Sequence, residues 1–281
     1  MKITSVLTLV ILISFVACKK KNSPTPAVTI NAGNDPNFKI VANNDGILSS
    51  LPKKVVVFDI PIYAASGVED TKLLHAANIM AQYLDNNEDG QVDNPTVVET
   101  MKTNKAFLFM WKTEADMLSS PPAGYTGQDL GNDETVPAWH TNGHTGRFDA
   151  ALEEVLHIIT HAGYSKAYPQ AFGEQTGSSI ANAMDKARGG QFASIPASYP
   201  AGAWYTYDDA TCNYSCMVTE YYYWALTSIL EAQANRLSEI QQEWTLNTKA
   251  KMQAQDIAGY QLLTDTQYSF PTKLPDGTYK R

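Results

Sequence analysis

Residues 148–163 read FDAALEEVLHIITHAG, and this stretch decides how we interpret the chain. Asp149 can cap or charge the start of a helix, and Gly163 is placed to end it. His157 and His161 lie four residues apart, so an α-helix turns both imidazoles to the same face, with their β-carbons roughly 6 Å apart. We therefore expect a helix over residues 148–162 that carries two potential metal ligands.

The segments around this helix predict an α+β fold dominated by helices. Strands are expected at residues 55–62 and 106–111, with a short edge strand near 135–139 in a long loop, and helices at residues 68–84, 95–102, 171–188 and 218–244. A small sheet from residues 38–62 and 105–140 should therefore precede a helical half. We expect one globular domain over residues 37–281.

The N-terminus predicts the compartment. A basic start at Met1-Lys2, an apolar run to Ala17 and a small residue at the cut are typical of a secretory signal. Cys18, which follows directly, resembles the lipobox cysteine of bacterial lipoproteins. The resemblance implies cleavage of residues 1–17, lipidation of Cys18 (palmitate included), a tether over residues 18–36 and a membrane-anchored protein of the bacterial cell envelope. The alternatives are an ordinary signal peptide or a spanning anchor, for which the run is shorter than the roughly 20 residues required.

The charge and composition of the chain argue against nucleic acid as a binding partner. The chain has 281 residues and a formal charge of −8, with charged residues at only 18%. Basic side chains do not gather with aromatic ones in a patch, so nucleic acid is not an expected partner. In an oxidising compartment, Cys212 and Cys216 most simply form a disulfide. A zinc pair is the other interpretation, but a second cysteine pair to complete it is missing from the sequence.

An acidic loop predicts a calcium site. Residues 85–93 read DNNEDGQVD and fit D-x-N-x-D-G-x-x-D, in which the glycine permits the sharp bend. The expected ligands are the side chains of Asp85, Asn87 and Asp89, the backbone carbonyl of Gln91, and Asp93 directly or through water. Residues 85–96 thus resemble an EF-hand loop. They depart from it at Thr96, which replaces the bidentate glutamate and which Glu99 could compensate. A solvated turn held by Asx hydrogen bonds is the alternative.

The histidine pair predicts a second metal. Two imidazoles at this spacing can chelate one zinc ion, as in the H-E-x-x-H helix of metallopeptidases. The order of elements over residues 55–235 is similar to the N-terminal half of zincin peptidases. The glutamate-zincin resemblance implies a third ligand from a later helix, for which Glu220 is the first candidate and Glu231 the reserve. The expected zinc ligands are therefore His157, His161 and Glu220, within helices that span residues 148–235.

The general base of such an enzyme is not in its usual place. Ile158 and Thr160 occupy the positions that hold the base in H-E-x-x-H and in its inverted form, and neither can accept a proton. Glu154 shares the face of His157, so we expect it to act as the base or to orient His157. Glu154-x-x-His157 also matches half of a di-iron site, but the sequence lacks a second E-x-x-H.

Two functions follow from these motifs. The first is a zincin-like envelope lipoprotein, a divergent zinc-dependent hydrolase or peptidase stabilised by calcium. The second is a non-catalytic calcium-binding lipoprotein that binds a protein or glycan partner. The distance between Glu220 and the two histidines separates them, because a shared metal requires all three side chains to converge. The roles of His140 and His144 do not follow from the sequence.

Overall fold

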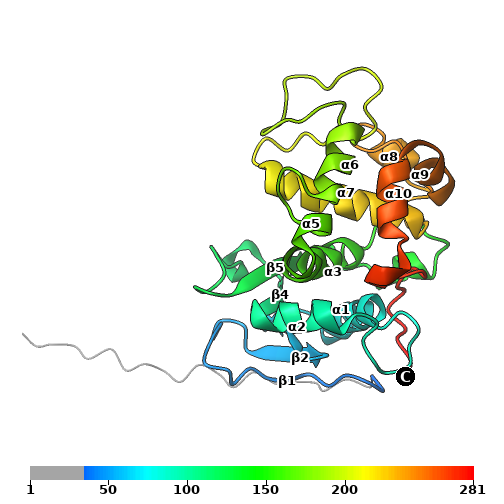
Figure 1. The fold of residues 1–281 in the computed structure, drawn as a ribbon. Helices are drawn as coiled ribbons and strands as arrows, with labels where there is room; N and C mark the ends of the chain where they lie inside the picture. Colours follow the sequence, from blue (N-terminus) through cyan, green and yellow to red (C-terminus); the bar gives the residue numbers. More distant parts are fainter. Residues whose placement is uncertain (1–34) are drawn as a thin grey trace, which may run out of the picture.

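The structure is a computed structural model that describes residues 35–281 (Figure 1). The predicted signal peptide 1–17, the lipidated Cys18 and all but the last two residues of the tether 18–36 lie outside this range and stay predictions. Within residues 35–281, no helix combines the length and the apolar character needed to cross a bilayer.

The first part of the chain builds a five-stranded mixed sheet in the order β1-β2-β3-β4-β5. The strands are β1 (Val41–Ala42), β2 (Lys53–Val57), β3 (Ile60–Ala64), β4 (Ala106–Trp111) and β5 (Thr126–Gly131). β1, β2 and β3 pair antiparallel, whereas β3, β4 and β5 pair parallel. A sheet followed by a helical half confirms the predicted α+β class.

The expected strand over residues 55–62 is a hairpin instead. Val57 pairs with Ile60, and the two residues between them, Phe58 and Asp59, have positive φ angles of 45° and 68°. Positive φ at both central positions is the geometry of a two-residue turn whose twist matches that of the flanking strands. The continuous run of apolar residues hid this turn, because neither Phe nor Asp is the glycine that usually marks it.

The edge strand lies earlier than predicted, at β5 rather than near residues 135–139. β5 pairs with β4 along its whole length, from Ala106 opposite Thr126 to Trp111 opposite Gly131. Its sequence, TGQDLG, contains only one β-branched residue, Thr126, and no aromatic one, so it lacks the composition that usually indicates a strand. Residues 137–140 form the 3₁₀-helix η2 (Pro137–His140), which Pro137 begins.

The other regular elements of the described chain are helices. They are α1 (Asp70–Leu84), α2 (Pro95–Thr103), α3 (Ala151–Ile159), α4 (Ser165–Ala167), α5 (Pro169–Phe172), α6 (Ser179–Ala187), α7 (Tyr214–Ile229), α8 (Leu237–Ile240), α9 (Lys249–Gln255) and α10 (Ile257–Leu263), with the short 3₁₀ turns η1 (Glu114–Asp116) and η4 (Thr266–Tyr268). α1 and α2 agree with the predicted helices 68–84 and 95–102. The predicted helix 171–188 is divided, because Ser178 caps the separate helix α6.

The helix predicted over residues 148–162 changes character in its second half. α3 ends at Ile159, a π-helical turn η3 (Thr160–Tyr164) follows, and the helical path continues to Ala167. Gly163 therefore does not end the helix. Its role is close packing on α2: a β-carbon there would lie 2.7 Å from Val97 Cγ1.

α7 begins and ends earlier than the predicted helix 218–244. Asn213 caps it by accepting a hydrogen bond from Cys216 N, and Cys212 and Cys216 form the predicted disulfide across this first turn. The helix ends at Ile229, and Glu231 then takes a positive φ of 65°, a conformation that continues no α-helix.

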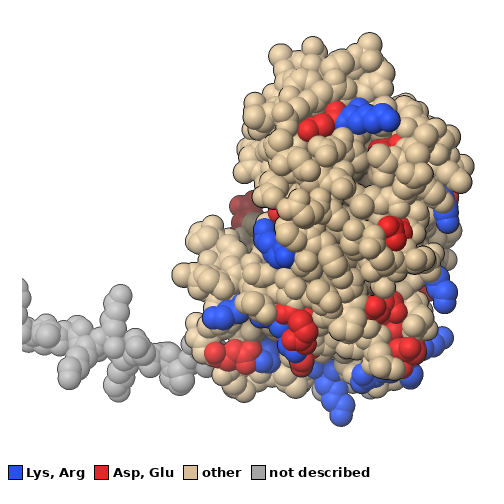
Figure 2. Space-filling model, in the orientation of Figure 1, with Lys and Arg blue, Asp and Glu red and all other residues tan. Residues whose placement is uncertain are grey.

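α3 lies at the centre of the molecule. It contacts α1, β4 and β5 in the sheet half and α7 in the helical half (Figure 1). On the face seen in Figure 2, lysine, arginine and acidic residues gather over the sheet half with both signs interleaved, and the helical half is sparsely charged. Any group on α3 that faces α7 is thus placed between the two halves.

Candidate metal centre

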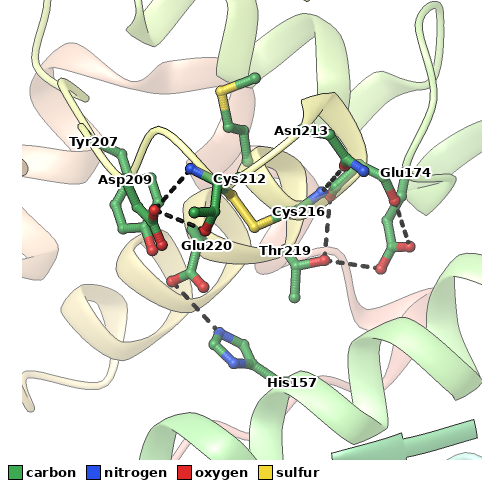
Figure 3. The surroundings of a disulfide bond; sticks show 12 residues. His157, Glu174, Tyr207, Asp209, Cys212, Asn213, Cys216, Thr219 and Glu220 are labelled. Atoms are coloured by element: carbon green, nitrogen blue, oxygen red, sulfur yellow. Dashed lines mark hydrogen bonds and ion pairs between the residues drawn. A yellow bond between two sulfur atoms is a disulfide. The ribbon is translucent and has the colours of Figure 1, made fainter. Parts of the chain in front are cut away.

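α3 and α7 bring two glutamates and one histidine together between the halves of the molecule. Glu153 and His157 lie one turn apart on α3, and Glu220 faces them from α7. One potential ligand atom from each residue lies within 4.8 Å of the other two. His157 Nε2 is 3.7 Å from Glu220 Oε2 (Figure 3).

This Glu153–His157–Glu220 cluster is acidic and largely shielded from water. The His157 side chain is 6% exposed, and those of Glu220 and Glu154 are 14% and 21% exposed. Burial raises the pKa of Glu153 and of Glu220, because a buried carboxylate loses hydration when it ionises. Burial disfavours the charged form of His157 too, but the charges of Glu220 and Glu154 outweigh it and raise the His157 pKa. Three carboxylates around one imidazole leave an excess of negative charge.

The two ring nitrogens of His157 have different surroundings. Nδ1 lies 3.4 Å from Glu154 Oε2, and that oxygen accepts a 2.6 Å hydrogen bond from Gln128 Nε2 on β5. Nε2 is buried and has no hydrogen-bond partner among residues 35–281. A buried polar atom without a partner is costly, and this one lies 3.7 Å from Oε2 of Glu220, one of the two carboxylates of the cluster.

The disulfide fixes the helix that carries Glu220. Cys216 lies in the first turn of α7, and Glu220 follows four residues later on the same face (Figure 3). The bond to Cys212 holds this first turn to the preceding loop. It therefore limits fraying of the helical turn that precedes Glu220.

His161 does not join the cluster. Its Nδ1 lies 2.7 Å from Glu174 Oε2, and Thr219 Oγ1 and Ser215 Oγ of α7 donate to the same carboxylate at 3.0 and 3.2 Å. His161 lies at the start of the π-helical turn η3, and its ring pairs with Glu174 instead of Glu220. The predicted set His157, His161 and Glu220 is thus not brought together. His161 ties the π turn to α7 through Glu174.

The structure points to Glu153, which our sequence analysis did not assign as a ligand. Glu153-Glu154-x-x-His157 has the spacing of H-E-x-x-H, with a glutamate in place of the first histidine. In this frame the residue directly after the first ligand is Glu154. His161 repeats the spacing of a zinc-binding histidine pair, so from sequence alone it is a stronger ligand candidate than Glu153. The reserve ligand Glu231 instead accepts a hydrogen bond from Lys249 N.

The donor set fits a divalent transition metal. Zinc binds nitrogen and oxygen at about 2.0–2.2 Å, so ligand atoms on one ion lie roughly 3–4 Å apart, close to the spacing of the cluster. Ligating histidines usually donate their other ring N–H to a carboxylate, and Glu154 is placed to accept it from His157. A ligand set of one imidazole and two carboxylates contains more oxygen donors than a set of two imidazoles and one carboxylate. Manganese(II) and iron(II) are therefore suitable ions beside zinc.

The predicted calcium loop has the expected backbone bend. Gly90 has a φ of 87°, and its N–H donates to Asp85 Oδ2 at 2.8 Å. Asp89 N donates to Asn87 Oδ1, and Gln91 N donates to Asp89 Oδ1, as in successive Asx turns. These contacts are compatible with both interpretations of the loop, the calcium site and the hydrogen-bonded turn.

The second half of the predicted calcium loop, from Asp93 onward, offers fewer free ligand oxygens. Asp93 accepts a 2.7 Å hydrogen bond from Asn86 N, and its pKa is raised by burial and by the charges of Asp85 and Asp89. Thr96 is exposed at the start of α2, and Glu99 Oε1 lies 2.9 Å from Lys102 Nζ. In this structure Glu99 thus pairs with Lys102.

The site's own geometry must carry the functional interpretation, because the chain matches no protein-family model, no curated protein and no solved structure at a significant level.

Proposed function

We propose that this protein is an envelope lipoprotein with a divalent metal centre at Glu153, His157 and Glu220, and that it acts as a metal-dependent hydrolase, with peptides as the first substrate class to test. The observation that carries the proposal is the buried, unpartnered Nε2 of His157 beside the two half-buried carboxylates of Glu153 and Glu220. The frame Glu153-Glu154-x-x-His157, with Glu220 from a later helix, supports the hydrolytic assignment.

The proposed centre assigns separate roles to the metal ligands, to the general base Glu154 and to Gln128. A divalent ion held by Glu153, His157 and Glu220 would supply Lewis acidity, to polarise a substrate carbonyl and to lower the pKa of water. Glu154 lies beside the proposed ligands without being one of them, and its side chain is more exposed than that of Glu220, so it can accept a proton from water. Gln128 fixes the Glu154 carboxylate through Oε2 and leaves Oε1 for the proton.

Metal content tests the ligand assignment. We expect the purified protein, loaded with zinc and freed of excess ion, to lose one equivalent when His157→Ala, Glu153→Ala or Glu220→Ala is introduced, because each change removes a ligand. His161→Ala is the matched control, since it removes a histidine one turn further along the same helical path. Inductively coupled plasma mass spectrometry on the four variants measures the difference.

The His161→Ala control also distinguishes the ligand set expected from the sequence, which includes His161, from the proposed set, which includes Glu153. Loss of the ion in His161→Ala with retention in Glu153→Ala would restore the ligand set expected from the sequence and exclude the one proposed here. Equal metal content in all four variants and in the wild type would contradict any centre at this position. The non-catalytic binding lipoprotein would then be the surviving function.

We further propose that residues 85–93 bind calcium. Asp85, Asp89 and Asp93 concentrate negative charge in one loop, and burial, together with the charges of Asp85 and Asp89, raises the pKa of Asp93. A calcium ion would relieve this repulsion and add the oxygen-rich coordination that the loop spacing suits.

Calcium should therefore raise the melting temperature of the wild type, and Asp89→Ala should remove that rise. The gain follows the logarithm of calcium concentration over Kd, so it is expected at about millimolar calcium, as in other extracellular modules. Glu99→Gln is the control, because Glu99 pairs with Lys102 outside the loop. Identical melting curves of the wild type in calcium and in chelator would contradict the site.

A further inference from the structure

A second group of potential metal ligands lies on the other side of α3. His75 on α1, His140 at the end of η2 and Asp149 just before α3 each offer one ligand atom within 4.8 Å of the other two. His75 Nε2 and His140 Nε2 lie 2.7 and 2.8 Å from the same atom, Asp149 Oδ2. We infer that His75, His140 and Asp149 form a second divalent metal site, of structural rather than catalytic character, which joins α1, η2 and α3.

The carboxylate of Asp149 is held as a ligand would be. Its Oδ1 accepts a 2.7 Å hydrogen bond from Val136 N, which leaves Oδ2 as the oxygen that faces both rings. Asp149 is fully buried, and its pKa is held low because the hydrogen bonds from His140 and His75 outweigh its burial. Outer contacts of this kind orient ligating carboxylates in known metal sites.

The two histidines are also enclosed. Their side chains are 7% and 3% exposed, and the ring centroids lie 5.3 Å apart. The C-terminal segment closes over His75: Gly277 has a φ of 80°, and a β-carbon there would lie 2.2 Å from His75 Nδ1. His140 Nδ1 is buried and has no hydrogen-bond partner within residues 35–281.

Two histidines and one carboxylate suit zinc, cobalt(II) or iron(II). Three ligands at about 2.0–2.1 Å from one tetrahedral ion lie roughly 3.4 Å apart, so the two short contacts to Asp149 would lengthen by about half an ångström on binding. Because the ligands come from α1, η2 and the start of α3, the ion would tie together segments that are far apart in sequence. The enclosure leaves little access for a substrate.

The experiment uses the full-length protein in detergent, loaded with cobalt(II), freed of excess ion and measured by elemental analysis and visible absorption. In a His157→Ala background, in which the centre at Glu153 is disabled, we expect one remaining equivalent of cobalt with ligand-field bands. Adding His75→Gln or His140→Asn should abolish it. His144→Asn should not, because His144 stacks on Trp139 and does not contact Asp149.

The design keeps the two sites separable. No cobalt in the folded His157→Ala protein, against one equivalent in the wild type, would overturn the second site while supporting the first. One equivalent that survives both His75→Gln and His140→Asn would overturn it as well. If those variants fail to fold, the cobalt count of the His157→Ala protein alone decides: one equivalent supports the second site, and none overturns it.

Discussion

Glu154→Gln should lower hydrolysis by the proposed centre by about 10²- to 10⁴-fold while the metal stays bound, which is the range typical for loss of a general base. Glutamine keeps the size of the side chain and can still contact His157 and Gln128, but it cannot accept a proton. The measurement is the cleavage of a mixture of internally quenched peptides, with metal content determined on the same samples.

Two controls make this result specific. His161→Ala should keep both metal and rate, because His161 contacts Glu174 outside the cluster. Glu153→Ala should lose both, because it removes a ligand. If Glu154→Gln retains the ion and cleaves as fast as the wild type, Glu154 is not the base. If it loses the ion, Glu154 acts mainly by orienting His157 through Nδ1.

Asp256→Ala should destabilise the folded protein by about 4 kcal/mol, the largest stability effect that we expect from a single substitution. Asp256 is 1% exposed, and its Oδ2 accepts hydrogen bonds from Trp204 Nε1 at 2.9 Å and Tyr221 Oη at 2.8 Å. Alanine leaves both buried donors without an acceptor, at about 1–3 kcal/mol each. It also removes the cap on Gly259 N, worth about 1 kcal/mol.

Thr248→Ala is the matched control for this substitution. Thr248 caps α9 by accepting from Lys251 N, as Asp256 caps α10, but it bonds no buried tyrosine or tryptophan. Its cost should be about 1 kcal/mol. Urea unfolding of both variants measures the difference, and equal costs would show that the Trp204 and Tyr221 contacts contribute nothing.

The same carboxylate predicts a pH dependence. Burial raises the pKa of Asp256 above its usual value of 3.8. A raised carboxyl pKa means that the folded state binds the proton more tightly, so the stabilising contribution of the group is complete below pH 3.8 and falls as the pH rises through the folded pKa. The cost of Asp256→Ala should therefore decrease as the pH is raised from 3.8 through that range.

The sequence alone predicted most helices and strands, because each depends on residues that lie close together in the chain. The apolar periodicity of residues 68–84 gave α1, Pro95 began α2, and the aromatic run 106–111 gave β4. The four-residue spacing of Cys212 and Cys216 allowed the disulfide. Each of these depends on backbone propensity or on neighbours within a few residues.

β5 shows where local signals fail. Residues 126–131 have a weak preference for strand, and they form one because β4 offers an unpaired edge. Gly127 permits this pairing: a β-carbon there would lie 2.5 Å from Phe107 Cζ. Pairing partners far apart in the chain decide such a strand, so its propensity alone is a poor guide.

For the candidate metal centre, the sequence by itself identified α3 as the helix that carries the chemistry, and named His157, Glu154 and Glu220. Tertiary structure decided the ligand set. The packing of α7 on α3 placed Glu220 beside His157 and Glu153, whereas His161 pairs with Glu174. Helical spacing fixes which side chains share a face, but only the packing of a second helix fixes which of them meet a common partner.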